Sequence, residues 1–308
     1  MRTVALVVAA VMAVSGAQGA MSLPAGLSGA LEGLKQKAAL TTAAFGAADL
    51  DESELLDLTR DPDPGVRQAA TRALRNYMHS WRVRDRIKEV LDDGRETLEV
   101  RREAIKTLSI LLNDSQVTRK LRDAASDSRL DKPLRALAVK ALYAQLPYDS
   151  SAKSDVLDLA RRGSDPDLRK AALWALFAVS QNDYEVQRAL RDILRSGSEE
   201  VEVRVEALRS LYMAMSQEDV KETMVDLARS GNDGSLRYGA VLALSARRAD
   251  YRVQDVLEDL AKRGDPPAIR RAAVLALGDP GNEEILAYFH LGYRRMPNGR
   301  YVSPLDGE

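Results

Sequence analysis

Cysteine is absent from this chain of 308 residues, and histidine occurs only twice, at His79 and His290. Without cysteine the chain forms no disulfide and carries out no thiol redox chemistry. Two histidines so distant in sequence are too few for a His-rich metal site, since zinc sites take three or four ligands. The sequence therefore excludes a His-rich or Cys-rich metal site, and we expect neither a metal nor a cofactor.

Sequence signals of catalysis are missing as well. Neither histidine has a nucleophile elbow near it, so a Ser-His-Asp arrangement is not indicated. The chain has no glycine-rich loop of the kind that cradles phosphates and no dinucleotide fingerprint. Carboxylates are abundant, but on helices they usually cap an end or face solvent. We therefore predict a protein without catalytic residues that is not an enzyme.

Aromatic residues are also scarce, at 5% of the chain, and the formal net charge is only −1. Alanine and leucine, which favour close-packed helices, are abundant instead. The near-neutral balance favours neither nucleic acid nor a membrane surface as a partner. No stretch alternates with period two, so the pattern indicates helices without a sheet.

The N-terminal residues form a distinct segment. Arg2 is followed by an apolar run from Thr3 to Val14 and then by small residues. Crossing a bilayer takes ~20 apolar residues, whereas a shorter run suits the core of a signal peptide. A short anchor or a buried helix is the alternative. We predict a signal peptide over 1–20 and an exported protein, periplasmic or extracellular, with no membrane span after the signal is removed.

One pattern returns seven times along the chain, centred on an arginine, with 33 to 35 residues between successive copies. A branched aliphatic residue precedes each arginine, an alanine follows three residues after it, and a leucine follows seven residues after it. The arginines are Arg67, Arg101, Arg135, Arg169, Arg204, Arg237 and Arg270. A period of roughly 20 to 50 residues is typical of a solenoid.

Each copy also has a first half whose apolar residues recur three and four positions apart, as in an amphipathic helix. Five of these halves close on a glycine, which often ends a helix. The turn that follows carries Asp-Pro in three copies, where Asp can cap backbone N–H groups and Pro suits the first helical turn. The three turns are Asp63-Pro64, Asp165-Pro166 and Asp265-Pro266. Copies three and five depart from this pattern, so we expect irregular turns there.

These halves predict an all-α solenoid, a superhelix of about seven two-helix units. We expect the units over residues 51–280, preceded by an N-terminal cap-helix region at 21–50 and followed by a C-terminal cap helix and tail at 281–308. A solenoid needs caps because its last face is otherwise apolar. In the tail, Tyr288, Phe289, Tyr293 and Tyr301 either cap the seventh unit or dock a partner.

The start of the second helix, Asp-Pro-x-x-x-Arg-x-x-Ala between Asp165 and Ala172, resembles that of short HEAT repeats. More narrowly, it resembles the HEAT-like repeats of bilin lyases, whereas the Trp and Leu-Gly of tetratricopeptide repeats are lacking. The resemblance covers about residues 50 to 280. It implies that Asp63, Asp165 and Asp167 and the repeated arginines are structural and form ladders between neighbouring repeats. The His-Glu pairs of HEAT-repeat iron hydroxylases are absent.

The second helices also predict a binding surface. On a helical wheel at about 100° per residue, the positions one, five and eight residues after the arginine lie opposite the packed face. By resemblance to HEAT solenoids, these positions line a concave groove. Because Trp, Tyr and Arg are favoured interface anchors, we name the aromatic and basic residues there the predicted anchors. They are Lys140, Tyr143, Lys170, Trp174, Phe177, Arg209, Tyr212 and Tyr238. Packing against the adjacent repeat is the alternative role for these aromatics.

The function we predict is that of a non-enzymatic scaffold that holds a protein or peptide in this groove. One alternative is an anionic polymer bound through a mildly basic groove, which predicts a steep loss of affinity with salt. Nucleic acid is not expected, because an exported chain rarely meets it. Another alternative is a lyase-like enzyme, because bilin lyases share the repeat. The sequence specifies neither the partner nor the oligomeric state.

Overall fold

The computed structural model describes residues 50–111, 114–279, 281–289 and 305. The predicted signal peptide, nearly all of the predicted N-terminal cap region, His290, Tyr293 and Tyr301 lie outside these residues. Within the described ranges the chain forms α-helices and short 3-10 helices and no strand, so the predicted all-α fold is confirmed. None of the helices in these ranges combines the length and apolar character needed to cross a bilayer.

The chain separates into two compact units, Met1–Glu103 and Ala104–Glu308. The described part of the first unit contains α3 (Glu52–Leu58), α4 (Pro64–Ala73), η1 (Leu74–Tyr77), α5 (Trp81–Asp92) and the start of α6 (Leu98–Leu108). Here α3 and α5 are the first helices of copies one and two, and Arg67 and Arg101 lie on the second helices. The sequence repeat is thus a pair of helices.

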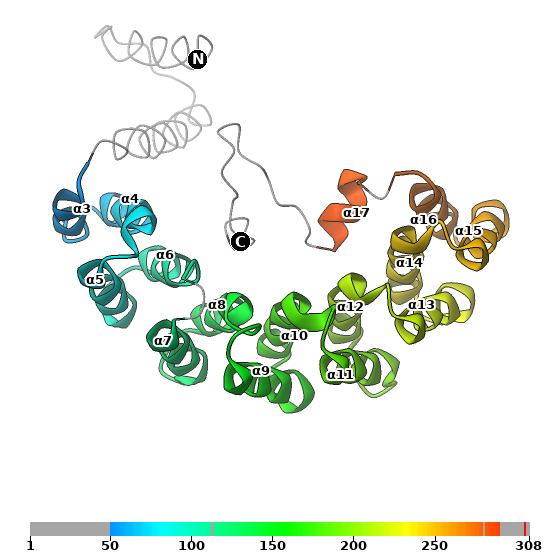
Figure 1. The fold of residues 1–308 in the computed structure, drawn as a ribbon, viewed down its shortest axis with the longest axis horizontal. Helices are drawn as coiled ribbons and strands as arrows, with labels where there is room; N and C mark the ends of the chain where they lie inside the picture. The colour runs from blue at the N-terminus through cyan, green and yellow to red at the C-terminus, as the bar shows by residue number, and fades with distance from the viewer. Residues whose placement is uncertain (1–49, 112–113, 280, 290–304, 306–308) are drawn as a thin grey trace, which may run out of the picture. The chain divides into compact units, whose positions relative to one another are not determined.

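The second unit contains five further helix pairs. Its first helices are α7 (Ser115–Ser126), α9 (Ser150–Arg162), α11 (Tyr184–Arg195), α13 (Glu218–Ser230) and α15 (Tyr251–Arg263). Its second helices are α8 (Lys132–Ala141), α10 (Pro166–Ser180), α12 (Val201–Ser210), α14 (Gly234–Ala243) and α16 (Pro267–Leu277). The 3-10 helices η2 (Leu142–Ala144), η3 (Tyr212–Ala214) and η4 (Leu244–Arg247) follow α8, α12 and α14. Figure 1 shows two layers in this unit, with the second helices side by side on the inner face.

Aspartates start several of the second helices, as the turns predicted. The Asp63 carboxylate accepts the N–H groups of Gly65 and Val66 at 2.7 and 3.1 Å, and Asp165 caps α10 in the same way. Each such cap contributes ~1 kcal/mol. The third Asp-Pro turn differs from the prediction, because α16 begins one residue later, after Pro266, and no side chain caps it. In copies three and five, α8 and α12 also begin without a side-chain cap.

The repeated alanine and leucine form the core of each helix pair. All seven alanines are buried, as are six of the seven leucines, the exception being Leu277 in the last repeat. Burying each leucine contributes ~1.5–3 kcal/mol. The packed face of the wheel is therefore confirmed.

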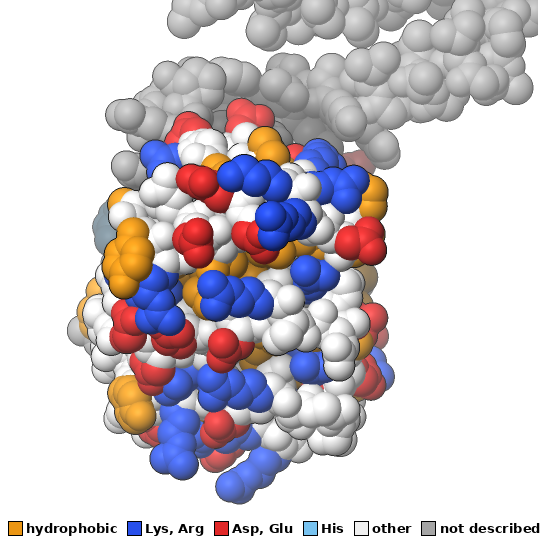
Figure 2. Space-filling view, turned by 90° about the vertical axis from the view of Figure 1, so that its right-hand side faces the viewer, with side chains coloured by type: hydrophobic (Ala, Val, Ile, Leu, Met, Phe, Trp, Pro, Cys, Tyr) orange, Lys and Arg blue, Asp and Glu red, His pale blue; other side chains and the backbone are white. Residues whose placement is uncertain are grey.

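At the C-terminal end of the second unit, the described residues leave part of the last helix pair exposed. Val241, four residues after its arginine, is 0% exposed, whereas Val274 at the same position of the last repeat is 59% exposed. On α15, Gln254 and Glu258 hydrogen-bond to each other at 3.0 Å on the surface. Figure 2 shows this end of the unit, where charged side chains of both signs separate small hydrophobic patches.

A last short helix, α17 (Glu283–Tyr288), does not cover this open end. It lies on the inner face of the second unit instead (Figure 1). The predicted C-terminal cap thus stays a prediction, and for residues 283–289 the structure shows contacts with the seventh repeat through Arg271 and with earlier repeats as well. The side chains of this segment find their partners on the concave surface.

Candidate functional site

The aromatic anchors are more buried than the helical wheel predicted. Trp174, placed at the centre of the exposed face, is only 8% exposed. Tyr143, Phe177, Tyr212 and Tyr238 are half-buried. The wheel was wrong for Trp174 because it treats one helix at a time, whereas α10 packs directly against α8 and α12.

Three of the predicted anchors form one packing cluster, with Lys140 on α8, Tyr143 on η2 and Trp174 on α10. The Trp174 ring meets the Tyr143 ring edge to face, with centroids 5.5 Å apart and an interplanar angle of 77°. The Lys140 ammonium lies 5.5 Å from the centroid of the Trp174 ring. Such an aromatic pair adds ~0.5–1.5 kcal/mol beyond its buried area. This arrangement is the alternative that the sequence left open, packing between adjacent repeats.

Three other predicted anchors, Lys170, Arg209 and Tyr238, line a cleft of about 670 Å³ on the inner face of the second unit. Residues of α10, α12, α14, α16 and α17 surround it. Val201 and Val205 form part of its apolar wall. The cleft thus combines an apolar wall with charged groups and a phenol.

The cations of the cleft stand beside carboxylates. The Lys170 ammonium is 2.8 Å from Asp167, and its hydrogen bond to that carboxylate raises the pKa of Lys170. The Arg209 guanidinium is 3.2 Å from Glu206. Glu202 lines the same cleft. This balance differs from the excess of positive charge that an anionic polymer requires.

The first turn of α17 is held to the inner face through Glu284. Its carboxylate accepts a hydrogen bond from the Tyr238 hydroxyl on α14 at 3.1 Å. Its other oxygen is 2.8 Å from the guanidinium of Arg271 on α16. One carboxylate of α17 therefore engages two repeats.

The last residue of α17, Tyr288, fits into a space beside Gly239. A Cβ at position 239 would overlap the Tyr288 hydroxyl, so only glycine admits the phenol there. The Arg209 guanidinium lies 4.7 Å from the centroid of the Tyr288 ring, a cation–π contact. The Tyr238 ring meets the same ring edge to face at 5.9 Å. Burial raises the pKa of the Tyr288 phenol, an effect that Arg209 partly opposes.

Phe289 completes the contact. Its ring stacks on Tyr212 with centroids 4.1 Å apart and an interplanar angle of 24°, and the residue is only 1% exposed. Arg209, Tyr212 and Tyr238 therefore bind residues of their own chain. The sequence offered Tyr288 and Phe289 as a cap of the seventh unit or as a docking segment, without indicating the inner face of their own chain.

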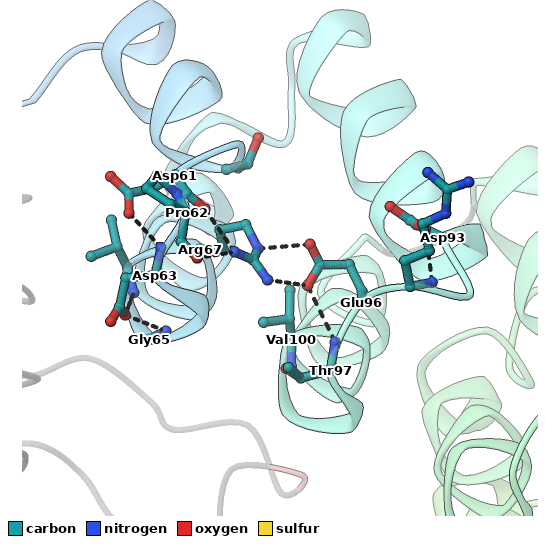
Figure 3. Close-up of polar contacts among 12 residues, drawn as sticks. Asp61, Pro62, Asp63, Gly65, Arg67, Asp93, Glu96, Thr97 and Val100 are labelled. Carbon is teal, nitrogen blue, oxygen red and sulfur yellow. Dashed lines mark hydrogen bonds and ion pairs between the residues drawn. The ribbon is translucent and has the colours of Figure 1, made fainter.

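The repeated arginines connect neighbouring helices and repeats. In the first unit, the Arg67 guanidinium pairs with Glu96 at 2.7 and 3.1 Å (Figure 3). In the second unit, Arg169 pairs with Glu199 at 2.6 and 2.7 Å. Arg101, Arg135, Arg204, Arg237 and Arg270 donate to backbone carbonyls. All seven arginines thus take part in packing the repeats.

The turn aspartates have different partners from those implied by the family resemblance. Asp63 caps α4 instead of pairing with a repeated arginine. Asp165 caps α10 and pairs with Lys132 of the preceding repeat at 2.9 Å. Asp167 pairs with Lys170. The acids that meet Arg67 and Arg169 are glutamates five residues before the next repeated arginine, a position that the Asp-Pro motif does not mark.

The helix pairs and their arginine contacts accord with a family match. The model for HEAT repeats matches residues 52–143 and 154–245, more than half of the chain. The chain is a HEAT-repeat protein. No curated protein sequence matches it.

This HEAT-repeat protein is distantly similar to several solved structures. The Escherichia coli protein YibA is 16% identical with a TM-score of 0.49, over 90% of this chain and 94% of YibA. A chain of the CpcE–CpcF phycocyanin lyase complex from Nostoc sp. PCC7120 is 18% identical with a TM-score of 0.44, over 74% of this chain and 94% of the matched chain. Human deoxyhypusine hydroxylase is 18% identical with a TM-score of 0.33, over 80% and 97%. Such distant similarity carries no activity over to this HEAT-repeat protein.

Among the described residues, the most exposed aromatic side chains of this HEAT-repeat protein are ones that the sequence pattern did not single out. They lie where first helices begin, and they are Trp81 (66% exposed), Tyr148 (56%), Tyr184 (66%) and Tyr251 (79%). The sequence could have indicated these aromatic residues, because each is adjacent to the N-cap residue of a first helix.

The inner face combines aromatic, cation–π and polar contacts within the chain. Rings stack, a guanidinium covers a phenol and a carboxylate accepts hydrogen bonds from two helices. Among the described residues, no three His, Cys, Asp or Glu side chains are grouped so as to hold a metal ion. The arrangement suits a short helix that carries an acid and aromatic residues.

Proposed function

We propose that this HEAT-repeat protein is a non-enzymatic scaffold that binds a segment of another protein on the inner face of its second unit. The observation that carries the proposal is the docking of α17 on this face, through Glu284, Tyr288 and Phe289. A surface that buries an aromatic side chain almost completely is typical of protein-binding grooves.

The cleft beside α17 supports the same function. It exposes the apolar side chains of Val201 and Val205 together with Lys170 and Arg209. An amphipathic helix laid in such a groove places apolar side chains against the wall and its polar groups against the charges. The proposed partner is therefore a protein segment, and we propose no cofactor.

Two other functions receive less support. Binding of an anionic polymer would need cations without nearby acids, whereas Lys170 and Arg209 stand beside Asp167 and Glu206. A lyase-like activity draws its support from the repeat type alone, and a bound tetrapyrrole would give the purified protein visible absorbance.

Peptide selection on the full chain tests the proposal. A library of displayed helical peptides is enriched on the wild type, and the enriched peptides are then measured against two matched variants. Ser235→Arg places a bulky side chain at an exposed position in the cleft, and Ser154→Arg makes the same change at an exposed position on α9. We expect Ser235→Arg to weaken binding at least tenfold and Ser154→Arg to leave it unchanged. Equal binding to both variants, or no enrichment, would overturn the proposal.

We also propose that the protein acts after export. The support is the apolar run of residues 3–14 behind Arg2, with small residues after it. The test compares the full chain with a Leu6→Arg, Val8→Arg variant by cell fractionation and intact mass. Export predicts a shortened wild type in the exported fraction and a retained, full-length variant. Full-length protein in the same fraction for both would contradict it.

A further inference from the structure

We infer that residues 283–289 are a tethered self-ligand that occupies the partner-binding surface of this chain. The partner segment that replaces them has the same chemistry, a helix with a carboxylate followed four and five residues later by two aromatic side chains, as in Glu284, Tyr288 and Phe289. This inference rests on the proposed function and names both the partner chemistry and the regulation of that surface.

The position of α17 separates it from a structural cap. A cap would cover the apolar surface at the end of the array, yet Val274 there is 59% exposed. The segment instead reaches Tyr212, Tyr238 and Arg209, which lie on η3, α14 and α12. A helix of six residues is not stable alone in water, so its contacts with the inner face must hold it.

The space for the phenol is particular to the sixth repeat. Two residues after the repeated arginine, the chain has glycine only in this copy, at Gly239. The corresponding residues elsewhere are Ala69, Glu103, Leu137, Ala171, Glu206 and Ala272. Because any side chain at 239 would meet the Tyr288 hydroxyl and the Leu208 side chain, this glycine builds a pocket for one aromatic ring.

A longer partner segment can displace the self-ligand. Tyr288 itself lines the cleft of about 670 Å³, which continues beyond α17 toward Lys170 and Val201. A segment that repeats the α17 contacts and also fills this cleft gains apolar contacts that α17 does not make. It must compete with a tethered ligand, whose effective concentration is on the order of mM for a short flexible linker. The docked α17 therefore lowers the apparent affinity for a partner.

The test uses the full chain and a fluorescent synthetic peptide of residues 281–289, GNEEILAYF. The open variant, Tyr288→Ala with Phe289→Ala, removes the aromatic part of the self-ligand. We expect it to bind the peptide at least tenfold more tightly than the wild type does. If circular dichroism and thermal melting show that the double variant folds poorly, Phe289→Ala alone replaces it in the same peptide-binding measurement.

Gly239→Ala is the discriminating variant. Alanine favours the helix more than glycine does, so α14 stays folded, while the new Cβ excludes Tyr288. We expect faster hydrogen exchange at residues 285–289 in this variant, together with loss of peptide binding when the same change is placed in the open variant. Unchanged exchange, or peptide binding that Gly239→Ala leaves intact, would overturn the self-ligand.

The peptides selected for the proposed function separate the two ideas. If they bind the open variant more tightly than the wild type, the self-ligand competes with partners as inferred. If they bind both equally and are still lost with Ser235→Arg, the scaffold function stands and the self-ligand is overturned. If GNEEILAYF fails to bind a folded open variant, the contacts of α17 do not define the partner chemistry, and the inference is also overturned.

Discussion

Both terminal nitrogens of the Arg169 guanidinium donate hydrogen bonds to the carboxylate of Glu199 in the next repeat, at 2.6 and 2.7 Å. Both side chains are largely buried, at 14% and 20% exposed. A two-bond arginine–carboxylate pair is stronger and more directional than a single-bond pair. In the copies before and after, the residue in the position of Glu199 is Ser164 for Arg135 and Asn232 for Arg204. Neither of these can form the ion pair, so it strengthens one step of the array.

Glu199→Gln should lower stability by about 1–2 kcal/mol at pH 7, because it leaves Arg169 without its charged partner. The hydrogen bond from Arg169 holds the pKa of Glu199 below its usual value. A carboxyl with a depressed folded pKa stabilises above its unfolded pKa of about 4.3, and that stability is lost as pH falls through the folded pKa. The difference in free energy of unfolding between wild type and variant, measured by urea denaturation, should therefore shrink from pH 7 to pH 3.

Glu185→Gln is the control for this prediction. Glu185 pairs with Arg161 at 3.3 Å but is 62% exposed, so its loss should cost under ~0.5 kcal/mol at any pH. A gap for Glu199→Gln that stays constant from pH 7 to pH 3 would contradict the role of its charge.

The period of the arginines predicts the helix pairs, and the buried alanines and leucines confirm the face that packs within each pair. That much follows from sequence because it depends on contacts inside a short stretch of chain. The burial of Trp174 depends on how closely α8 approaches α10, which no single-helix wheel contains. The place of Tyr288 depends on Gly239, far away in sequence, and a lone glycine in a helix gives no sign of its partner.

Removing each of the two tryptophan side chains should have very different effects on stability. Trp174→Ala should cost about 3–5 kcal/mol, because the side chain is buried against Tyr143. Trp81→Ala should stay within about 0.5 kcal/mol, because Trp81 is 66% exposed. Denaturation midpoints measure both, and iodide should quench Trp81 fluorescence more than Trp174 fluorescence. Equal costs would show that Trp174 faces the groove as the wheel predicted.

Two valines at the same repeat position test whether the C-terminal end is open. Val241→Thr should cost about 1–3 kcal/mol, since it places an unpaired hydroxyl at a position that is 0% exposed. Val274→Thr makes the same change at a position that is 59% exposed and should stay within about 0.5 kcal/mol. Comparable losses in urea midpoint would mean that the end is covered in solution, by a second copy or by another part of the chain.

Docking of α17 should weaken when the Tyr238 hydroxyl is lost. Tyr238→Phe removes the hydrogen bond to Glu284, and a hydrogen bond to a charged group contributes ~1.5–3 kcal/mol. Docking should therefore fall by roughly tenfold or more at pH 7. Because the chain has no cysteine, a fluorophore on Ala287→Cys, an exposed position of α17, can report docking at a single site.

Alkaline pH should release α17 in the same assay. Burial and the hydrogen bond to Glu284 raise the pKa of Tyr238, and burial raises the pKa of Tyr288. A phenol with a raised folded pKa stabilises fully below its unfolded value of about 10, and this stability is lost as pH rises through the folded pKa. Release should be steeper in pH for the wild type, where two phenols ionise, than for Tyr238→Phe, where one remains. A label at Ser154→Cys reports general unfolding over the same range, and identical release curves for the two proteins would show that Tyr238 does not hold α17.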